Sequence, residues 1–156
     1  MQQVSNKLRE QVLELYNPKQ RVLLDAYIDY PKIEGTFLIG PCYYANCTLE
    51  HATDIEIQLC LNQLAYLGVA EAIRQEVHPL LREKSFSKLQ KECIVITESY
   101  KKFRKPIPTD RELIGNLVFG NILKSKNKSG IIFSSANFNF ENDSCVGNIR
   151  FAIIDK

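Results

Sequence analysis

Residues 54–75 read DIEIQLCLNQLAYLGVAEAIRQ and form the longest segment with helical character in the chain. Thr53 or Asp54 can cap its start, and an acidic residue at that end also suits the helix dipole. Its apolar side chains do not form a single stripe: one face carries Ile57, Cys60, Leu61, Leu64 and Gly68, and the other carries Ile55, Leu59 and Tyr66. A helix that is apolar nearly all round is normally buried on more than one side. We therefore predict a long helix that is wrapped by its own sheet and covered by a partner subunit.

Strand patterns flank this helix on both sides along the sequence. Upstream we expect a helix over Asn6–Tyr16, a strand over Arg21–Tyr30, a turn over Pro31–Gly35, a strand over Gly35–Gly40, and a short strand or irregular segment over Tyr43–Thr48. Downstream we expect a helix from Val77 to about Leu89 and strands over Cys93–Tyr100, Glu112–Leu123, Gly130–Phe140 and Cys145–Ile154, with hairpin turns at Lys126–Gly130 and Asn142–Ser144. This order predicts one α+β domain over residues 1–156, with one large antiparallel sheet and one dominant helix.

Composition argues against several classes of function. The formal net charge is only +2, so no overall basic field points to nucleic acid as a partner. No apolar run has the length of a signal peptide or a membrane span, which favours a soluble, cytoplasmic protein with no membrane partner. The five cysteines are scattered without a C-x-x-C pair and there are only two histidines. We therefore expect neither a disulfide framework nor a metal site.

Two polar residues of the long helix are candidates for catalysis. Asn62 and Tyr66 are four residues apart, so their side chains leave the same face of the helix one above the other. An amide N–H and a phenol O–H aimed at one point can hold a thioester carbonyl while negative charge builds on its oxygen. The alternative is structural, with Tyr66 as a core aromatic and Asn62 as a satisfied buried amide, and the spacing alone favours that alternative.

A histidine and an aspartate are candidates for acid–base chemistry. His51 lies just before the long helix, where the helix N-terminus favours a neutral ring that can act as a general base. A solvent-exposed loop histidine is the alternative. Asp25 lies in the middle of a predicted strand, and its carboxylate either faces solvent or points into a site.

The sharpest charge cluster is Lys101-Lys-Phe-Arg-Lys105-Pro106. Four cations within five residues suit a phosphate group, such as that of coenzyme A or of the phosphopantetheine arm of a carrier protein. Solvated charges at the end of a strand are the alternative interpretation.

Several of these segments together resemble the FcoT family of hotdog-fold long-chain acyl thioesterases. The residues that carry the resemblance are Tyr16, Leu23-Leu-Asp25-Ala26, Gly35-Thr-Phe-Leu-Ile-Gly40, Tyr44, His51, Glu56, Cys60-Leu-Asn-Gln-Leu-Ala-Tyr66 and Phe103-Arg-Lys-Pro106. The similarity runs from about Tyr16 to Pro106, whereas the C-terminal strands match only in pattern. Departures from the family pattern are Thr53 in place of asparagine, Asn46 in place of arginine, and one extra residue between Thr48 and His51. These departures bear on substrate choice and on the catalytic partners.

The resemblance implies a hotdog fold, in which a curved antiparallel sheet wraps the long helix and two subunits form the working dimer or a larger assembly of dimers. It implies acyl sites at the dimer interface and a substrate carried on phosphopantetheine or coenzyme A, with no further cofactor. Carried over residue by residue, it places Tyr16, Tyr44, Asn62 and Tyr66 at polar positions of the pocket and His51 in the adjacent loop. Relatives in the family also add glycine to the β-carbon of a 2-enoyl thioester and release the N-substituted β-amino acid by hydrolysis, in isonitrile or β-amino acid biosynthesis.

We therefore predict an enzyme that processes the thioester of an acyl carrier protein or of coenzyme A. Hydrolysis is the leading reaction, and Michael addition of glycine followed by hydrolysis is the alternative. The predicted catalytic residues are His51, Asn62, Tyr66, Tyr44 and Asp25, with Asp25 paired to His51 as the base; the predicted substrate-binding residues are Tyr16, Glu56, Thr53, Lys102, Arg104 and Lys105. Rival hypotheses are a non-catalytic dimer that binds acyl chains and a dehydratase that uses His51 with Glu56.

Overall fold

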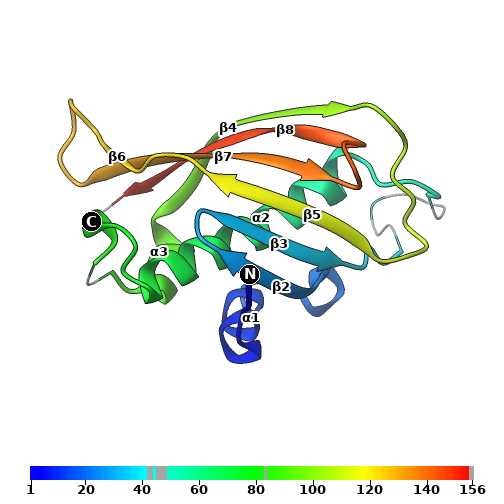
Figure 1. The fold of residues 1–156 in the computed structure, drawn as a ribbon, viewed down its shortest axis with the longest axis horizontal. Helices are drawn as coiled ribbons and strands as arrows, with labels where there is room; N and C mark the ends of the chain where they lie inside the picture. Colours follow the sequence, from blue (N-terminus) through cyan, green and yellow to red (C-terminus); the bar gives the residue numbers. More distant parts are fainter. Residues whose placement is uncertain (42–43, 45–48, 83, 155–156) are drawn as a thin grey trace.

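The long helix predicted from the sequence is α2 (Asp54–Arg74), and it lies along the inner face of one large curved sheet (Figure 1). The structure is a computed structural model that describes residues 1–41, 44, 49–82 and 84–154. The other helices are α1 (Asn6–Leu13), α3 (Phe86–Glu92) and the short 3₁₀ turns η1 (Pro18–Gln20) and η2 (Pro79–Leu81). The strands are β1 (Gln2–Gln3), β2 (Leu23–Asp29), β3 (Lys32–Phe37), β4 (Ile94–Phe103), β5 (Leu113–Phe119), β6 (Leu123–Lys124), β7 (Ile131–Phe140) and β8 (Cys145–Ile154).

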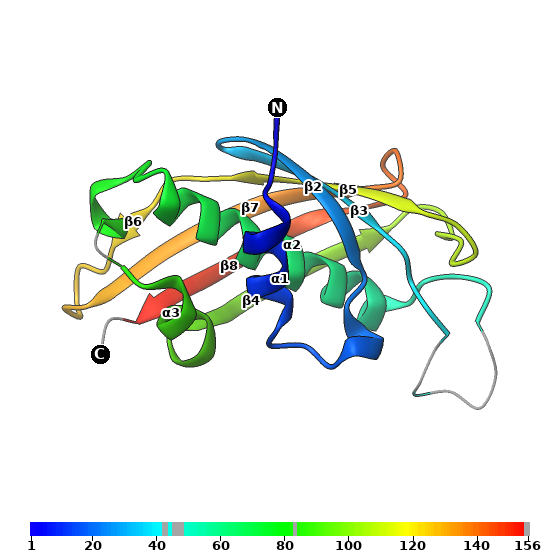
Figure 2. The same ribbon diagram turned by 90° about the horizontal axis from the view of Figure 1, so that it is seen from below.

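Within the described residues the sheet has eight strands: seven follow the spatial order β1-β2-β3-β5-β7-β8-β4, and β6 adds a short pairing with β7. Every pair is antiparallel. The chain leaves the sheet after β3, runs through α2 and α3, and rejoins the sheet at its far edge as β4 (Figure 2). As a result α2 crosses the sheet's inner face and β4 forms an edge strand. The prediction of an α+β chain with one antiparallel sheet and one dominant helix is confirmed.

Helix α2 begins with a reciprocal capping box. The Thr53 side chain accepts a hydrogen bond from the helix backbone, and the Glu56 carboxylate accepts one from the Thr53 backbone N–H at 2.7 Å. The predicted inner face is buried, with Ile57, Cys60, Leu61 and Leu64 all inaccessible to solvent. On the opposite face Ile55 is 49% exposed, while Leu59 and Tyr66 are half-buried.

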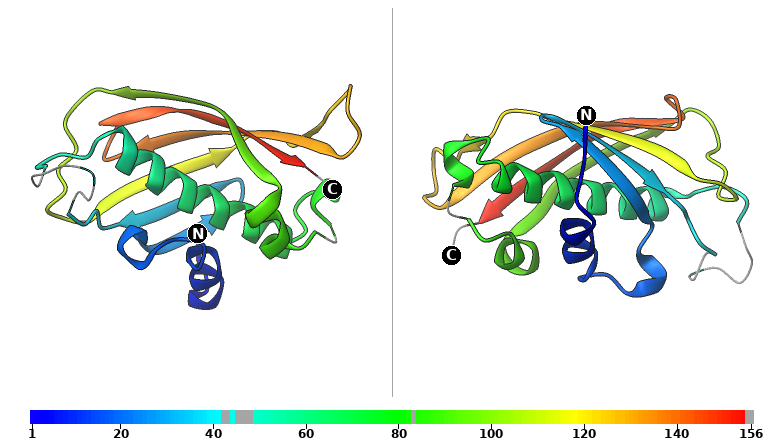
Figure 3. Two further views of the ribbon diagram at one scale, coloured as in Figure 1. Left: turned by 180° about the vertical axis from the view of Figure 1, so that it is seen from behind. Right: turned by 60° about the horizontal axis from the view of Figure 1, so that its bottom comes forward.

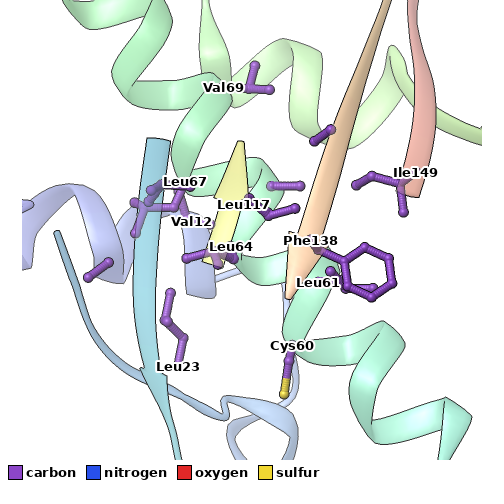
Figure 4. Close-up of a cluster of buried hydrophobic side chains, with 14 of the residues drawn as sticks. Val12, Leu23, Cys60, Leu61, Leu64, Leu67, Val69, Leu117, Phe138 and Ile149 are labelled. Atoms are coloured by element: carbon purple, nitrogen blue, oxygen red, sulfur yellow. The ribbon is translucent and has the colours of Figure 1, made fainter. Parts of the chain in front are cut away.

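The core lies between α2 and the inner face of the sheet. Leu61 and Leu64 of α2 pack in a cluster with Leu117 of β5, Phe138 of β7 and Ile149 of β8 (Figure 4). Burying each such side chain stabilises the fold by about 1.5–3 kcal/mol. Helix α1 lies below the sheet alongside α2 and adds Val12 and Leu13 to this core (Figure 3).

Several predicted boundaries are wrong, and each error has a local cause. Strand β3 begins at Lys32, so the predicted turn over Pro31–Gly35 is mostly strand, because these residues pair with both β2 and β5. Helix α1 ends at Leu13 rather than Tyr16. The predicted strand over Glu112–Leu123 is divided into β5 and the start of β6.

The predicted helix from Val77 to Leu89 is instead two short elements, η2 and α3. Glu76 adopts a left-handed backbone conformation with φ of 50°, which ends the preceding helix, and Pro79 then starts a new 3₁₀ turn capped by His78. The predicted segment Tyr43–Thr48 lies outside the described residues except for Tyr44. In the described part of the chain, no helix combines the length and the apolar character needed to cross a bilayer.

Candidate active site

Asn62 and Tyr66 line one narrow hollow between α2 and the strands β4 and β8. The rest of its lining is apolar: Ala65, Val69, Ile94, Ile96, Ile149 and Phe151. The structure thus brings the two residues together, as their spacing predicts. The Asn62 Oδ1 accepts a hydrogen bond of 2.8 Å from the Gln58 Nε2. Among the residues that the structure describes, nothing accepts a hydrogen bond from the Asn62 amide nitrogen or the Tyr66 hydroxyl, so both donors are available to a ligand.

Tyr16, in the turn that follows α1, is a neighbour of Tyr66. Burial raises the pKa of the Tyr16 phenol, and the neighbouring Tyr66 raises it further. Burial likewise raises the pKa of Tyr66. Both phenols are therefore protonated at neutral pH, which makes them hydrogen-bond donors rather than bases. Tyr16 thus lies near Tyr66, although it does not line the hollow that Tyr66 shares with Asn62.

Tyr44, Thr53 and Glu56 form a second group at the start of α2. The Tyr44 hydroxyl bonds the Glu56 carboxylate and lies 2.6 Å from the Thr53 Oγ1, which itself donates to Glu56 at 2.5 Å. Burial by itself would raise the pKa of Glu56, but the hydrogen bonds from Thr53 and Tyr44 together lower it. Thr53 and Glu56 are thus occupied by the helix cap and by Tyr44. A carboxylate held in its ionised form by three donors is a weak proton acceptor, which disfavours the dehydratase hypothesis.

His51 opens onto a larger cavity of about 490 Å³, lined by His51, Ala52, Thr53, Asp54 and the segment Phe103–Pro106. Backbone contacts bring these two segments together. The Ala52 N–H donates to the Ile107 carbonyl at 2.7 Å, and His51 forms an isolated β-bridge with Pro108. Arg104 and Lys105 contribute the cationic side of the cavity. Lys102 is exposed and does not line it. Of the three cations predicted to bind phosphate, only Arg104 and Lys105 therefore lie at the cavity.

Two predicted associations are not formed within this chain. The Asp25 carboxylate accepts hydrogen bonds of 2.8 Å from Gln3 and from the Ala26 N–H, and in the described part of the chain no hydrogen bond or ion pair joins it to His51. His51 is also separated from the donor pair. His51 precedes the first residue of α2, Asp54, and Asn62 lies eight residues further along the helix. Since an α-helix rises about 1.5 Å per residue, about 12 Å of helix lies between the end of α2 near His51 and Asn62.

Sequence reasoning missed a set of polar residues beside the donor pair. Gln58 links Asn62 to Lys101, whose ammonium lies 2.5 Å from the Gln58 Oε1 and 3.2 Å from the Asp54 carboxylate. A usable signal existed for Gln58, which is four residues before Asn62 and therefore on the same helix face. The sequence did not distinguish Lys101 from the three other cations of the run 101–105. Over the described ranges, His, Cys, Asp and Glu side chains form no group of three or more that could hold a metal ion.

Comparisons with known proteins agree with this architecture. A family model described as the FcoT-like thioesterase domain matches residues 11–153. A curated protein of Mycobacterium bovis named (2E)-enoyl-[ACP] glycyltransferase is 34% identical over 112 residues, which is 67% of this chain and 61% of that protein. Its counterpart in Mycobacterium marinum is 35% identical over the same length, covering 60% of that protein. The chain thus covers less than two thirds of the length of these relatives.

Solved structures support the fold alone. A sigma28-regulated virulence protein from Campylobacter jejuni superposes with a TM-score of 0.57 at 14% identity, covering 96% of this chain and 97% of that one. A thioesterase superfamily protein from Shewanella loihica gives a TM-score of 0.50 at 10% identity, with 85% and 91% covered. The eight-stranded antiparallel sheet around one long helix fits the hotdog fold of that superfamily.

Proposed function

This chain belongs to the FcoT-like thioesterase family, and we propose that it processes an acyl thioester carried by an acyl carrier protein or by coenzyme A. The observation that carries the proposal is the pair of unpartnered donors, Asn62 and Tyr66, at the wall of an apolar hollow. A thioester carbonyl placed between them would receive two hydrogen bonds as its oxygen becomes negative. Donors fixed in a water-poor site are worth far more than the same donors in water.

Hydrolysis is the simplest reaction for this arrangement. Water adds to the thioester carbonyl, the charge on the oxygen is held by Asn62 and Tyr66, and collapse of the intermediate releases the carboxylic acid and the carrier thiol. Tyr16 supplies a second protonated phenol near Tyr66, while Tyr44 is held at the start of α2 by Glu56. No cofactor takes part in this scheme, because the carrier arm itself presents the thioester.

The cavity beside His51 suits the anionic part of the carrier. Arg104 and Lys105 line it, and a phosphate of coenzyme A or of phosphopantetheine would place its charge there. The Asp54 carboxylate lies in the same lining, but its charge is offset by the ion pair with Lys101. His51 would be the base that activates water or an amine.

A homodimer is part of this proposal. Strand β4 is at the edge of the sheet, and in the described structure no strand pairs with its outer side. The half-buried Tyr66 of α2 lies beneath this edge, where it shares a hollow with Ile94 and Ile96. Since about 12 Å of helix separates His51 from Asn62 within one chain, a second copy would be the source of a base closer to the donors. Light scattering of the purified protein tests the proposal, because a monomer at working concentration would contradict it.

Glycine addition is the second candidate, supported by the names of the curated relatives. The amine of glycine would add to the β-carbon of a 2-enoyl thioester, and the resulting enolate would place its negative charge on the same oxygen that Asn62 and Tyr66 hold. The α-carbon then takes up a proton while the amine loses one, and hydrolysis follows. A cation must hold the glycine carboxylate in this scheme. Arg104 lies in the cavity at the start of α2, so, like the base, it would act on the donor pair of a second copy.

One experiment separates the two reactions. The protein is incubated with saturated and 2-enoyl straight-chain thioesters of short, medium and long chain, each loaded on acyl carrier protein and on coenzyme A, with and without glycine. Mass spectrometry then identifies the products. Free fatty acid in the absence of glycine supports hydrolysis. An N-carboxymethyl β-amino acid that forms only with glycine, with no free acid without it, would replace hydrolysis by glycine addition.

Variants test whether the donors act in catalysis. Asn62→Ala and Tyr66→Phe should each lower kcat by about 10²-fold, as is typical for loss of one oxyanion donor. Turnover at the wild-type rate in the combined variant Asn62→Ala, Tyr66→Phe, His51→Ala would instead support a dimer that only binds acyl chains.

A further inference from the structure

We propose that Lys101 is a positioning residue, which acts through Gln58 to hold the amide N–H group of Asn62 toward the acyl carbonyl. The inference deepens the proposed function and rests on it, since it explains why the amide of Asn62 presents its nitrogen rather than its oxygen to a ligand.

Lys101 points inward from the edge strand β4 and is almost buried. Its side chain is 9% exposed, whereas the next residue, Lys102, is exposed on the opposite side of the strand. The Lys101 ammonium lies 2.5 Å from the Gln58 Oε1, 3.0 Å from the Ser99 Oγ and 3.2 Å from the Asp54 Oδ1. Its three hydrogens therefore have three acceptors, on α2 and on β4 itself.

The ammonium determines which way the Gln58 amide faces. A lysine side chain offers three donors and no acceptor, so Gln58 must turn its oxygen toward Lys101. The Ser99 hydroxyl strengthens this orientation, because it accepts from Lys101 and donates to the same Gln58 oxygen at 3.0 Å. The Gln58 amide nitrogen is consequently directed away from Lys101.

The orientation then passes to Asn62, one helical turn further along α2. The Gln58 Nε2 donates to the Asn62 Oδ1 at 2.8 Å. Because the Asn62 oxygen is engaged as an acceptor, its amide nitrogen is left as the group that Asn62 can offer to a ligand beside Tyr66. Reversal of the amide would set the Asn62 oxygen against a carbonyl oxygen, which is repulsive, and would set two amide N–H groups against each other at Gln58.

The test uses a change that keeps the shape of Gln58 but reverses its hydrogen bonding to Asn62. In Gln58→Glu the carboxylate accepts from Lys101 at least as well as the amide does, but it has no N–H for Asn62, whose amide must then turn to donate to it. The substrate is the thioester that the wild type turns over best in the experiment described under Proposed function. We expect kcat on this substrate to fall about 10²-fold, as for Asn62→Ala. KM and the melting temperature should stay near their wild-type values.

Matched variants separate positioning from general effects. Gln11→Glu makes the same chemical change at an exposed position of α1 and should leave kcat unchanged. Lys101→Met should lower kcat, and Lys101→Arg, which again offers only donors, should retain more of it. In an Asn62→Ala background, Gln58→Glu should have no further effect, because residues that act through one another are not additive.

The outcomes distinguish the two levels of the proposal. If Asn62→Ala leaves kcat unchanged, the oxyanion role of Asn62 fails and the relay fails with it. If Asn62→Ala lowers kcat but Gln58→Glu does not, the thioester function stands and the relay from Lys101 is overturned. A Gln58→Glu effect that adds fully to that of Asn62→Ala overturns the relay in the same way.

Discussion

The phenols of Tyr16 and Tyr66 provide a pH test of the donor role. Burial raises both pKa values, so the protonated, hydrogen-bonding forms persist as the pH rises toward the ordinary tyrosine pKa of about 10. We expect the ratio of kcat between the wild type and Tyr66→Phe to stay constant from neutral pH to about pH 9.5. Steady-state rates across this range measure it. A ratio that changes several-fold as the pH rises through this interval would show that Tyr66 acts as a base.

Glu56 makes the stability of the fold depend on pH. Its pKa is lowered in the folded state, so its contribution is present above the unfolded value of about 4.5 and is lost as pH falls through the folded value. Glu56→Gln should lower the free energy of unfolding by about 1 kcal/mol at neutral pH, through the weakened capping box. Urea titrations from neutral pH to well below 4.5 should show the two proteins converging. A difference that stays constant with pH would mean that the charge of Glu56 does not matter.

The residues of the candidate site differ in how far the sequence reveals them. Asn62 and Tyr66 were predictable together, because helical spacing alone fixes their common face. Lys101 was not, since a run of cations gives no sign of which one turns inward until the register of β4 against β8 is known. The partner of Asp25 was also hidden, because Gln3 belongs to a two-residue strand whose pairing depends entirely on tertiary contacts.

At the scale of elements, the predicted bounds were accurate where residues within the segment itself determine where the helix or strand begins and ends. Helix α2 begins at a capping Thr53 and ends within one residue of the expected position, and β8 matches its predicted span. The segment after α2 failed because its helical pattern is broken by backbone geometry. Glu76 adopts a left-handed backbone conformation, which can be predicted from sequence for glycine or asparagine but not for glutamate.

Gln63 joins α2 to the segment that carries Tyr16. Its buried side chain accepts hydrogen bonds from the backbone N–H groups of Val22 and Leu23, both at 3.1 Å, and donates to the Gln20 carbonyl at 2.6 Å. Gln63→Leu fits the space but leaves these groups unpaired, so we expect the free energy of unfolding to fall by about 2–4 kcal/mol. Chemical denaturation measures it. Gln11→Leu, on an exposed surface, is the control, and a similar small loss in both variants would contradict the anchoring role.

On the scale of the whole molecule, the insertion of α2, α3 and β4 between β3 and β5 creates the site. Two neighbouring strands of the sheet, β3 and β5, are separated in sequence by the whole of this insertion. It places α2 across the sheet and returns the chain at the far edge, so that β4 supplies Lys101 to the first turns of the helix and the segment directly after β4 supplies Arg104 to the cavity beside His51. One stretch of chain, β4 and the residues after it, therefore serves both the donor pair and the cationic cavity.

The cationic cavity should distinguish carrier-bound thioesters from small ones. Neutralising Arg104 and Lys105 together removes the charges that would meet a carrier phosphate, so we expect KM for an acyl-CoA or acyl carrier protein substrate to rise about tenfold or more with kcat little changed. The N-acetylcysteamine thioester of the same acyl chain has no phosphate, and its kcat/KM should be unaffected. Lys102→Ala lowers the net charge from a position outside the cavity and serves as the control for general electrostatic attraction. Equal losses with the phosphate-free thioester would show that Arg104 and Lys105 act on the fold or on the acyl chain instead of the carrier.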